Sequence, residues 1–447
     1  MPTYLAIDIG TTNIKAMAVT DDGMLAEASV ATPWTSRKGL RVLDPRGLIE
    51  TTISVVRKGL NQLGFVAEHV TALGVTSMGE VGLFVTPEGP LGYIGAWQDL
   101  SPTEEAYRDL LSTWDAQDLF ERTGMVPGPK FGLLRMRAES QLQQPDACWL
   151  SVADFIVWHL TGGECVTQTS LAARTMAYRW QEAEWDDELL TWAQLRRVHM
   201  PRVITQPVSV GQVRVSDDRR LIGAEVVNAG HDHIVGAYGA SLQVGELMDS
   251  TGTAEPLVIR SPRPILSPEA RTLGVMWSQG LFDHDNYVVL LPTPGGGAPE
   301  AWARHILGIS WNDLRDVGTT RDTHVSFDVQ GWLEGNASWH GLGYESSRFD
   351  LYWAVLNGVA TSLSARIGDM EHLMQRRYTD LKVVGGIAKH YLWLAVRERV
   401  LQREQLLMEP NNAALIGAIN GAARAVEQHC PIIATWQPLS ITSVREA

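Results

Sequence analysis

An aspartate and a Gly-Thr-Thr turn near the start of the chain could together hold a phosphate group and its metal ion. Asp8 interrupts the apolar run 5–9, which predicts a buried strand, and a carboxylate buried there is costly unless something pairs with it. Gly10 lets a ligand approach the backbone, and Thr11 and Thr12 add hydroxyl groups. The N–H groups of such a turn can bind an anion, and Asp8 could hold Mg²⁺ through water. An ordinary hairpin, with Asp8 bonded to the turn amides, fits the same residues.

A turn of similar composition follows in the middle of the chain. The stretch LMDSTGTAEPLVIR resembles AIDIGTTNIKAMAV, because each has an apolar strand, an aspartate, a glycine–threonine turn and a second strand. This repeat places Thr251, Gly252 and Thr253 at the start of a second half, where a solvent-exposed turn is the alternative. Two related domains with a nucleotide between them would bring the two hairpins face to face. We therefore predict two domains, residues 1–243 and 244–447.

A third candidate for chemistry is Asp232, in the sequence GHDH. It follows an apolar run and starts a predicted helix, so it could accept a proton from a substrate hydroxyl group. The alternative is that Asp232 only caps that helix. His231 and His233 flank it, but alternate residues at a helix start do not share a face, so we do not expect a metal site there.

The elements that must position these residues alternate between strands and helices. We expect strands over 3–30, 70–77, 81–92 and 247–259, helices over 48–64, 151–162 and 411–429, and strand–helix pairs over 224–241 and 380–401. This alternation predicts an α/β fold, and 447 residues are enough for two or three domains with cores of their own.

Composition excludes several classes of protein. The formal net charge of −14 argues against a nucleic-acid-binding surface, which would need a basic stripe. The three cysteines form no CxxC motif and fit a reducing cytoplasm as free, buried thiols. No signal peptide or apolar run long enough to cross a membrane is evident, so we expect a cytoplasmic protein without a membrane partner.

Six stretches, taken in order, resemble the FGGY carbohydrate kinases of the actin-like, sugar-kinase and heat-shock ATPase superfamily. They are IDIGTTNIKAMAVTDDG, GVTSMGEVGLFVTPEGPLGYIGAWQD, ADFIVWHLTGGECVTQTSLAART, AGHDHIVGAYGA, DSTGTAE, and the pair VVGGIAKHYLW and NNAALIGAINGAA. The resemblance covers residues 3 to 425. It implies two ribonuclease-H-like (actin-like ATPase) domains with an active-site cleft between them. The implied reaction is transfer of the γ-phosphoryl group of ATP to a hydroxyl group of a small sugar, such as a pentulose or hexulose, or of a polyol.

The resemblance also implies a role for each candidate residue. Asp232 is the catalytic residue and Asp8 positions Mg²⁺. The expected ATP-binding residues are Gly10, Thr11, Thr12, Thr251, Gly252 and Thr253 at the phosphates, Gly385 and Gly386 at the adenosine, and Gly296 and Gly297 at a second wall. The expected acceptor-binding residues are Glu80, Trp97, Gln98, Asp99 and Asp232. For each glycine pair, a loop without a ligand is the alternative.

The acceptor segment departs from known patterns of the family. Ketopentose kinases tend to carry Gln-Met-His-Gly where this chain has 78–81 as Met-Gly-Glu-Val, and glycerol kinases carry Gln-Arg-Glu-Thr, which shares only Glu80. The acceptor therefore stays open. Two alternatives also stay open: a nucleotide or sugar sensor without catalysis, and an actin-like or chaperone-like ATPase. A homodimer is a further expectation.

Overall fold

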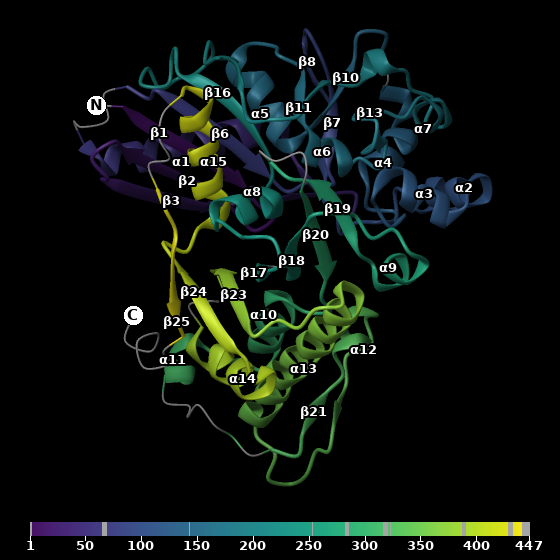
Figure 1. The fold of residues 1–447 in the computed structure, drawn as a ribbon, viewed down its shortest axis with the longest axis vertical. Coiled ribbons are helices and arrows are strands. Elements are labelled where there is room, and N and C mark those ends of the chain that lie inside the picture. Colours follow the sequence, from purple (N-terminus) through teal and green to yellow (C-terminus); the bar gives the residue numbers. More distant parts are fainter. Residues whose placement is uncertain are drawn as a thin grey trace.

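The structure is a computed structural model that describes residues 2–64, 69–142, 144–252, 254–281, 286–315, 321, 323–386, 390–427 and 432–439. Its chain forms two halves, each built on a β-sheet with helices packed on it (Figure 1). The prediction of an α/β fold in two halves is confirmed. Among the described residues no helix is both long and apolar enough to cross a lipid bilayer.

The first sheet has six strands in the order β15-β16-β6-β1-β2-β3. Their bounds are β1 Thr3–Ile9, β2 Asn13–Thr20, β3 Leu25–Ala31, β6 Ala72–Ser77, β15 Ser209–Gln212 and β16 Glu225–His231. Strands β1, β2 and β3 form an antiparallel meander, whereas β1, β6 and β16 are parallel. The strands predicted over 3–30 therefore form, as a meander of three strands.

The second sheet repeats this plan. Its order is β19-β20-β18-β17-β23-β24-β25, with bounds β17 Leu247–Thr251, β18 Pro256–Ser261, β19 Met276–Gln279, β20 Tyr287–Pro292, β23 Asp380–Gly385, β24 Glu404–Glu409 and β25 Thr435–Pro438. Strands β17, β18 and β20 are antiparallel neighbours, and β17, β23 and β24 are parallel. Strand for strand, β17 therefore corresponds to β1, and β23 to β6. Strand β19 is an addition at the edge.

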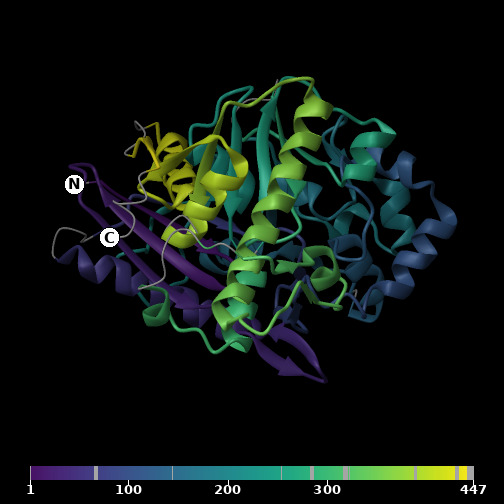
Figure 2. The same cartoon turned by 90° about the horizontal axis from the view of Figure 1, so that it is seen from below.

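Helices cover both sheets. In the first half they are α1 Pro45–Gln62, α2 Glu104–Thr113, α3 Ala116–Thr123, α4 Gly132–Ala138, α5 Val152–Thr161, α6 Thr169–Ala173, α7 Asp187–Trp192 and α8 Asp232–Gly239. In the second half they are α9 Pro268–Leu273, α10 Gly297–Ile306, α11 Trp311–Arg315, α12 Val329–Leu333, α13 Arg348–Met374, α14 Tyr391–Leu401 and α15 Ala413–Ala425. Figure 2 shows α13 as the long light-green helix.

Short strands form smaller sheets beside the first one. They are β4 Thr35–Arg37, β5 Leu40–Leu43 and β9 Ile94–Gly95 in one sheet, β7 Gly82–Thr86, β8 Gly89–Leu91 and β10 Cys148–Ser151 in another, and the pairs β11 Val166–Gln168 with β14 Arg202–Ile204 and β12 Tyr178–Arg179 with β13 Glu184–Trp185. In the second half, β21 Ser326–Phe327 pairs with β22 Trp339–His340. Single 3₁₀ turns occur at Ser140–Leu142 and Arg197–His199.

Helix α15 leaves the second half and packs on the first sheet, beside α8 (Figure 1). Its small residues allow this approach: a Cβ atom added at Gly417 would lie 2.1 Å from the carbonyl oxygen of Val235, and one at Gly74 would lie 2.3 Å from that of Ala418. The proposed division between residues 243 and 244 follows the chain, whereas in space α15 lies with the first half.

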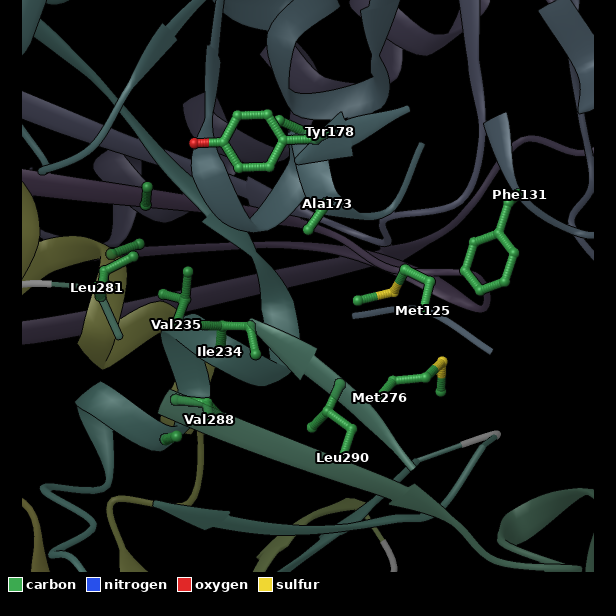
Figure 3. Close-up of a cluster of buried hydrophobic side chains, with 14 of the residues drawn as sticks. Met125, Phe131, Ala173, Tyr178, Ile234, Val235, Met276, Leu281, Val288 and Leu290 are labelled. Atoms are coloured by element: carbon green, nitrogen blue, oxygen red, sulfur yellow. The ribbon is translucent and has the colours of Figure 1, made fainter. Parts of the chain in front are cut away.

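One hydrophobic cluster joins the two halves. Met276 and Leu290 of the second sheet pack into the same cluster as Met125 and Ile234 of the first half (Figure 3). The opposite faces of the two sheets have clusters of their own. The inner face of each sheet is therefore the face toward this shared cluster.

Candidate active site

Asp8 lies on the inner face of the first sheet because of its position in β1. Side chains alternate between the faces of a strand, and Tyr4 and Ala6 belong to the shared cluster while Leu5 and Ile7 belong to the outer one. Asp8 is two residues after Ala6, so it lies on the same face of β1 as Tyr4 and Ala6. It therefore points toward the second half, one residue before the strand ends.

The environment of the Asp8 carboxylate suits a bound cation. The residue is 8% exposed, and its Oδ1 atom has no hydrogen-bond partner in the described part of the chain. Burial raises the pKa of Asp8 to about 6; Lys15, opposite it on β2, acts against this rise, and Asp232 adds to it. An unpartnered buried carboxylate oxygen is the kind of group that Mg²⁺ or a metal-bound water satisfies.

Asp232 stands where β16 ends and α8 begins. Gly230 has a φ of 110°, which favours glycine, and the pairing of β16 with β6 shifts register there, so the chain turns directly into the helix. The N-cap residue of α8 is His231, and the Asp232 carboxylate accepts a hydrogen bond of 2.7 Å from the N–H group of His233. The alternative that Asp232 is the helix cap is therefore not what the structure shows.

The pKa of Asp232 is raised to about 7. Burial is the main cause, and the negative charge of Glu80 adds to it, while the His233 hydrogen bond and the charges of Arg174 and Lys15 act in the opposite direction. A carboxylate whose pKa lies near neutrality is suited to take up a proton from an alcohol.

The two histidines beside Asp232 face its carboxylate, which corrects the expectation that they point apart. Nε2 of His231 lies 3.3 Å and Nε2 of His233 lies 3.9 Å from Oδ1 of Asp232. His231 precedes the helix in extended conformation, so the spacing rule for residues within a helix does not apply to it. Burial lowers the pKa of His233 to about 4 and that of His231 well below its usual value, so both rings are neutral.

Glu80, one of the predicted acceptor-binding residues, lies in the same group of charges as Asp232. Its Oε1 atom is 3.5 Å from the Lys130 ammonium group and 3.6 Å from the Arg174 guanidinium group. Burial raises the pKa of Glu80, but these two cations act against burial and the net shift is downward. Arg174 is 1% exposed, and its Nη1 atom is 3.1 Å from the sulfur of Met276 in the second half.

The other three expected acceptor residues occupy different environments. Trp97 donates from Nε1 to the Thr11 hydroxyl group over 3.1 Å, so it braces the first turn. The Asp99 carboxylate accepts a 2.6 Å hydrogen bond from the backbone N–H of Arg41, an exposed contact between distant parts of the chain. Oε1 of Gln98 is buried without a partner among the described residues. Their role in binding an acceptor stays a prediction.

The first turn is held by its own backbone and by two tryptophans. Gly10 donates its N–H to the Asn13 carbonyl over 3.0 Å, and Trp34 donates to the Thr11 carbonyl over 2.6 Å. The side chain of Thr12 is exposed. The turn is therefore built in advance of any ligand, and phosphate binding by its residues stays a prediction.

In the second turn, Ser250 rather than Asp249 is the counterpart of Asp8. Counted back from the turn glycines, Asp8 is two residues before Gly10 and Ser250 two residues before Gly252. Met248 belongs to the shared cluster, and Ser250, two residues further along β17, lies on the same inner face of the strand. Asp249, between them, faces outward, as Leu247 does. The repeat seen in the sequence is thus offset by one residue at the aspartate.

The remaining residues of the second turn are partly engaged. Thr251 donates its hydroxyl group to the Val384 carbonyl over 2.8 Å, and Gly252 accepts a 2.9 Å hydrogen bond at its carbonyl from Gly297. Thr253 lies outside the described residues. Phosphate binding at this turn stays a prediction.

The proposed adenosine segment lies next to this turn, because β23 is parallel to β17 and pairs Gly385 with Thr251. Gly385 has a φ of 106°, and a Cβ atom there would lie 2.0 Å from the Thr251 carbonyl oxygen, so only glycine fits. The Asn411 side chain bonds both the N–H and the carbonyl of Gly385, over 2.9 and 2.8 Å. A Cβ atom at Gly386 would meet nothing within 4 Å.

A buried ion cluster supports the other proposed wall. Arg397 of α14 bonds Asp249 and also Glu255, the latter over 3.0 Å, and all three side chains are nearly inaccessible to solvent. Glu255 in turn accepts a 3.2 Å hydrogen bond from the N–H of Gly296, the N-cap residue of α10. Asp249 is thus paired with Arg397 on the outer side of β17.

The site contains residues that the sequence interpretation missed. Arg174 lies within one of the motifs quoted above and could have been found there, whereas Lys130 stands in a loop without a motif. Ser250 and Glu255 flank the turn that was recognised.

Comparisons with known proteins identify the family and agree with the fold. Residues 3–239 match the model of the N-terminal domain of the FGGY family of carbohydrate kinases. The chain is 24% identical to L-fuculokinase of Escherichia coli (strain K12) over 441 residues, covering 93% of this chain and 90% of that protein. It is 27% identical to glycerol kinase of Trichlorobacter lovleyi over 442 residues, covering 90% of this chain and 85% of that protein. The crystal structure of Plasmodium falciparum glycerol kinase with ADP has a TM-score of 0.80 at 17% identity, covering 100% of this chain and 92% of that chain.

Proposed function

Because this chain belongs to the FGGY family of carbohydrate kinases, we propose that it transfers the γ-phosphoryl group of ATP to a hydroxyl group of a small sugar or polyol. The candidate acceptors are ketoses such as a pentulose or hexulose, and polyols. The observation that carries the proposal is that Asp8, near the end of β1, and Asp232, the first residue of α8, share one group of charges. The negative charge of Asp232 raises the pKa of Asp8, and the charge of Lys15 lowers the pKa of both carboxyl groups.

Asp232 would receive the proton of the attacking hydroxyl group. Its carboxylate is fixed at one oxygen by the N–H of His233, which orients the other oxygen, and its raised pKa matches a base that works near neutral pH. Glu80, held by Lys130 and Arg174, would accept hydrogen bonds from other hydroxyl groups of the acceptor.

The nucleotide would lie between the two turns. The turn at Gly10 would form one wall and the turn at Gly252 the other, and Gly385, which pairs with Thr251, would continue the second wall together with Gly386. Asp8, with its unpartnered oxygen, is the residue that fits Mg²⁺, and that ion would neutralise charge on the phosphates when bound. Closure of the two halves would keep water away from the γ-phosphoryl group.

A panel of ketoses and polyols tests the proposal. ADP release is measured with Mg·ATP and each compound in turn, and Asp232→Asn serves as the matched inactive variant. Stimulation by one class of acceptor, lost in the variant, supports the kinase. ADP release that no acceptor changes would support an ATPase, and binding of ATP and sugar without ADP release would support a sensor.

The cytoplasm is the compartment that we propose for this reaction. The proposal rests on the cysteines: Cys148 and Cys165 are both free thiols in the structure.

A further inference from the structure

Three neighbouring side chains at the start of α8 point ligand atoms toward one another. One ring nitrogen each of His231 and His233 and a carboxylate oxygen of Asp232 all lie within 4.8 Å of one another. The two distances to Oδ1 of Asp232 are 3.3 and 3.9 Å. Ligands bound to one ion at about 2.0–2.2 Å in tetrahedral geometry stand roughly this far apart, so small side-chain movements would bring all three onto one ion.

The second nitrogen of His233 has the partner that a metal-binding histidine needs. Its Nδ1 atom lies 3.0 Å from the hydroxyl oxygen of Ser250, which fixes the ring with Nε2 toward Asp232. Such an outer hydrogen bond orients a ligating imidazole. His231 is 2% exposed, and within the described chain its Nδ1 atom has no partner.

The charges around the cluster do not by themselves select a cation. Asp8 and Glu80 add negative charge, while Arg174, Lys130 and Lys15 add positive charge. Affinity must therefore come from the ligand atoms. Two imidazole nitrogens and one carboxylate oxygen are a ligand set for borderline divalent cations such as Zn²⁺ and Co²⁺, whereas Mg²⁺ prefers oxygen ligands only.

We propose that His231, Asp232 and His233 form a site for a borderline transition-metal cation, separate in chemistry from the Mg²⁺ site at Asp8. An ion bound there occupies the carboxylate that the acceptor hydroxyl group needs. Zn²⁺ is therefore an inhibitor that competes with the acceptor and not with Mg·ATP. The inhibition rests on the proposed function, but the binding does not.

Binding is tested on the full chain without ATP or sugar. Zn²⁺ is titrated by calorimetry and Co²⁺ by visible absorption, and we expect one equivalent with an absorption spectrum of nitrogen coordination. His233→Gln should weaken binding at least tenfold, whereas His305→Gln, at an exposed histidine of α10, should not change it. No binding by the wild type, or equal binding by the His233→Gln variant, would overturn the site.

A second variant avoids the buried histidines altogether. Ser250→Ala removes only the hydroxyl partner of His233, and loss of an outer hydrogen bond typically costs roughly 10- to 100-fold in metal affinity. Unchanged Zn²⁺ affinity in a folded Ser250→Ala protein would contradict the assigned geometry. If Zn²⁺ binds but no acceptor is ever phosphorylated, the site stands and the proposed function fails.

Discussion

The His233 ring and the Ser250 hydroxyl group lie 3.0 Å apart and join the two halves of the molecule at the proposed reaction centre. His233 belongs to the helix that starts with Asp232, and Ser250 belongs to the strand that leads into the second turn. The position of the proposed base is thereby tied to the position of the proposed phosphate site.

Loss of this hydrogen bond should slow turnover without unfolding the protein. A hydrogen bond between neutral groups contributes about 0.5–1.5 kcal/mol, so Ser250→Ala should lower kcat by roughly 2- to 10-fold. Steady-state kinetics with the identified acceptor measures the change, and Ser112→Ala, on the exposed side of α2, is the control. Equal kcat for both variants would show that the contact does not help to position Asp232.

Asp232→Asn should abolish most of the activity. Loss of a general base commonly lowers kcat by roughly 10²- to 10⁴-fold. In the wild type, kcat/KM should fall as the pH drops through about 7, because the protonated Asp232 cannot accept a proton. A variant with near-normal turnover, or a pH profile that is flat between 6 and 8, would remove Asp232 from the reaction.

The same substitution should stabilise the fold at alkaline pH. The folded-state pKa of Asp232, about 7, exceeds the usual unfolded value, so the folded state binds the proton more tightly than the unfolded state does. The free energy of unfolding therefore falls as the pH rises from about 4 to 7. Asn cannot ionise, so the variant does not lose this stability. Thermal unfolding at pH 5 and pH 8 should show a gain for Asp232→Asn, on the order of 1 kcal/mol, that is largest at pH 8. A loss of stability at pH 8 would mean that the carboxylate has a structural role.

Asp8→Ala should weaken the dependence on Mg²⁺ and phosphoryl transfer together. The reason is that its unpartnered buried oxygen is the proposed contact to the ion or its water. Titration of activity with Mg²⁺ at fixed ATP measures this, and circular dichroism verifies the fold. If the variant unfolds, Asp8 is a structural residue of the hairpin instead.

Much of this site follows from local sequence, but the side on which a residue lies does not. The pattern of strand, aspartate and turn correctly locates both hairpins. It pairs Asp8 with Asp249, although one extra residue before Gly252 puts Ser250 on the inner face. A shift of one residue in a strand exchanges its faces, so a sequence pattern that tolerates one insertion cannot assign the side.

Long-range contacts are the other part that the sequence does not reveal. The small residues of α15 indicate close packing, but not that the helix returns to the first sheet. Lys130 reaches Glu80 from a loop 50 positions away in the chain, and nothing near it in the sequence indicates this contact. Such contacts depend on the assembled fold and not on local pattern.

The buried Asp249–Arg397–Glu255 cluster should respond unequally to neutral substitutions. Arg397→Met leaves two buried carboxylates without their cation, so it should destabilise the protein by about 3–5 kcal/mol. Glu255→Gln leaves the Asp249 carboxylate paired with Arg397, so it should lower the free energy of unfolding by less. It should also move the Gly296 N–H, which bonds Glu255, and therefore raise the KM for ATP more than the KM for the acceptor. Urea unfolding and steady-state kinetics measure the two effects. Equal destabilisation by both variants would contradict the charge argument.

Binding of ATP and acceptor should draw the two halves together, but only within limits set by their shared cluster. Met276 and Leu290 pack with Met125 and Ile234, so this side of the molecule should act as the hinge while the turns at Gly10 and Gly252 approach each other (Figure 3). Closure excludes water and completes the site. Small-angle scattering should report a smaller radius with both ligands than with either alone, and Ser250→Ala should close less fully. An unchanged radius in an enzyme that turns over would remove domain closure from the mechanism.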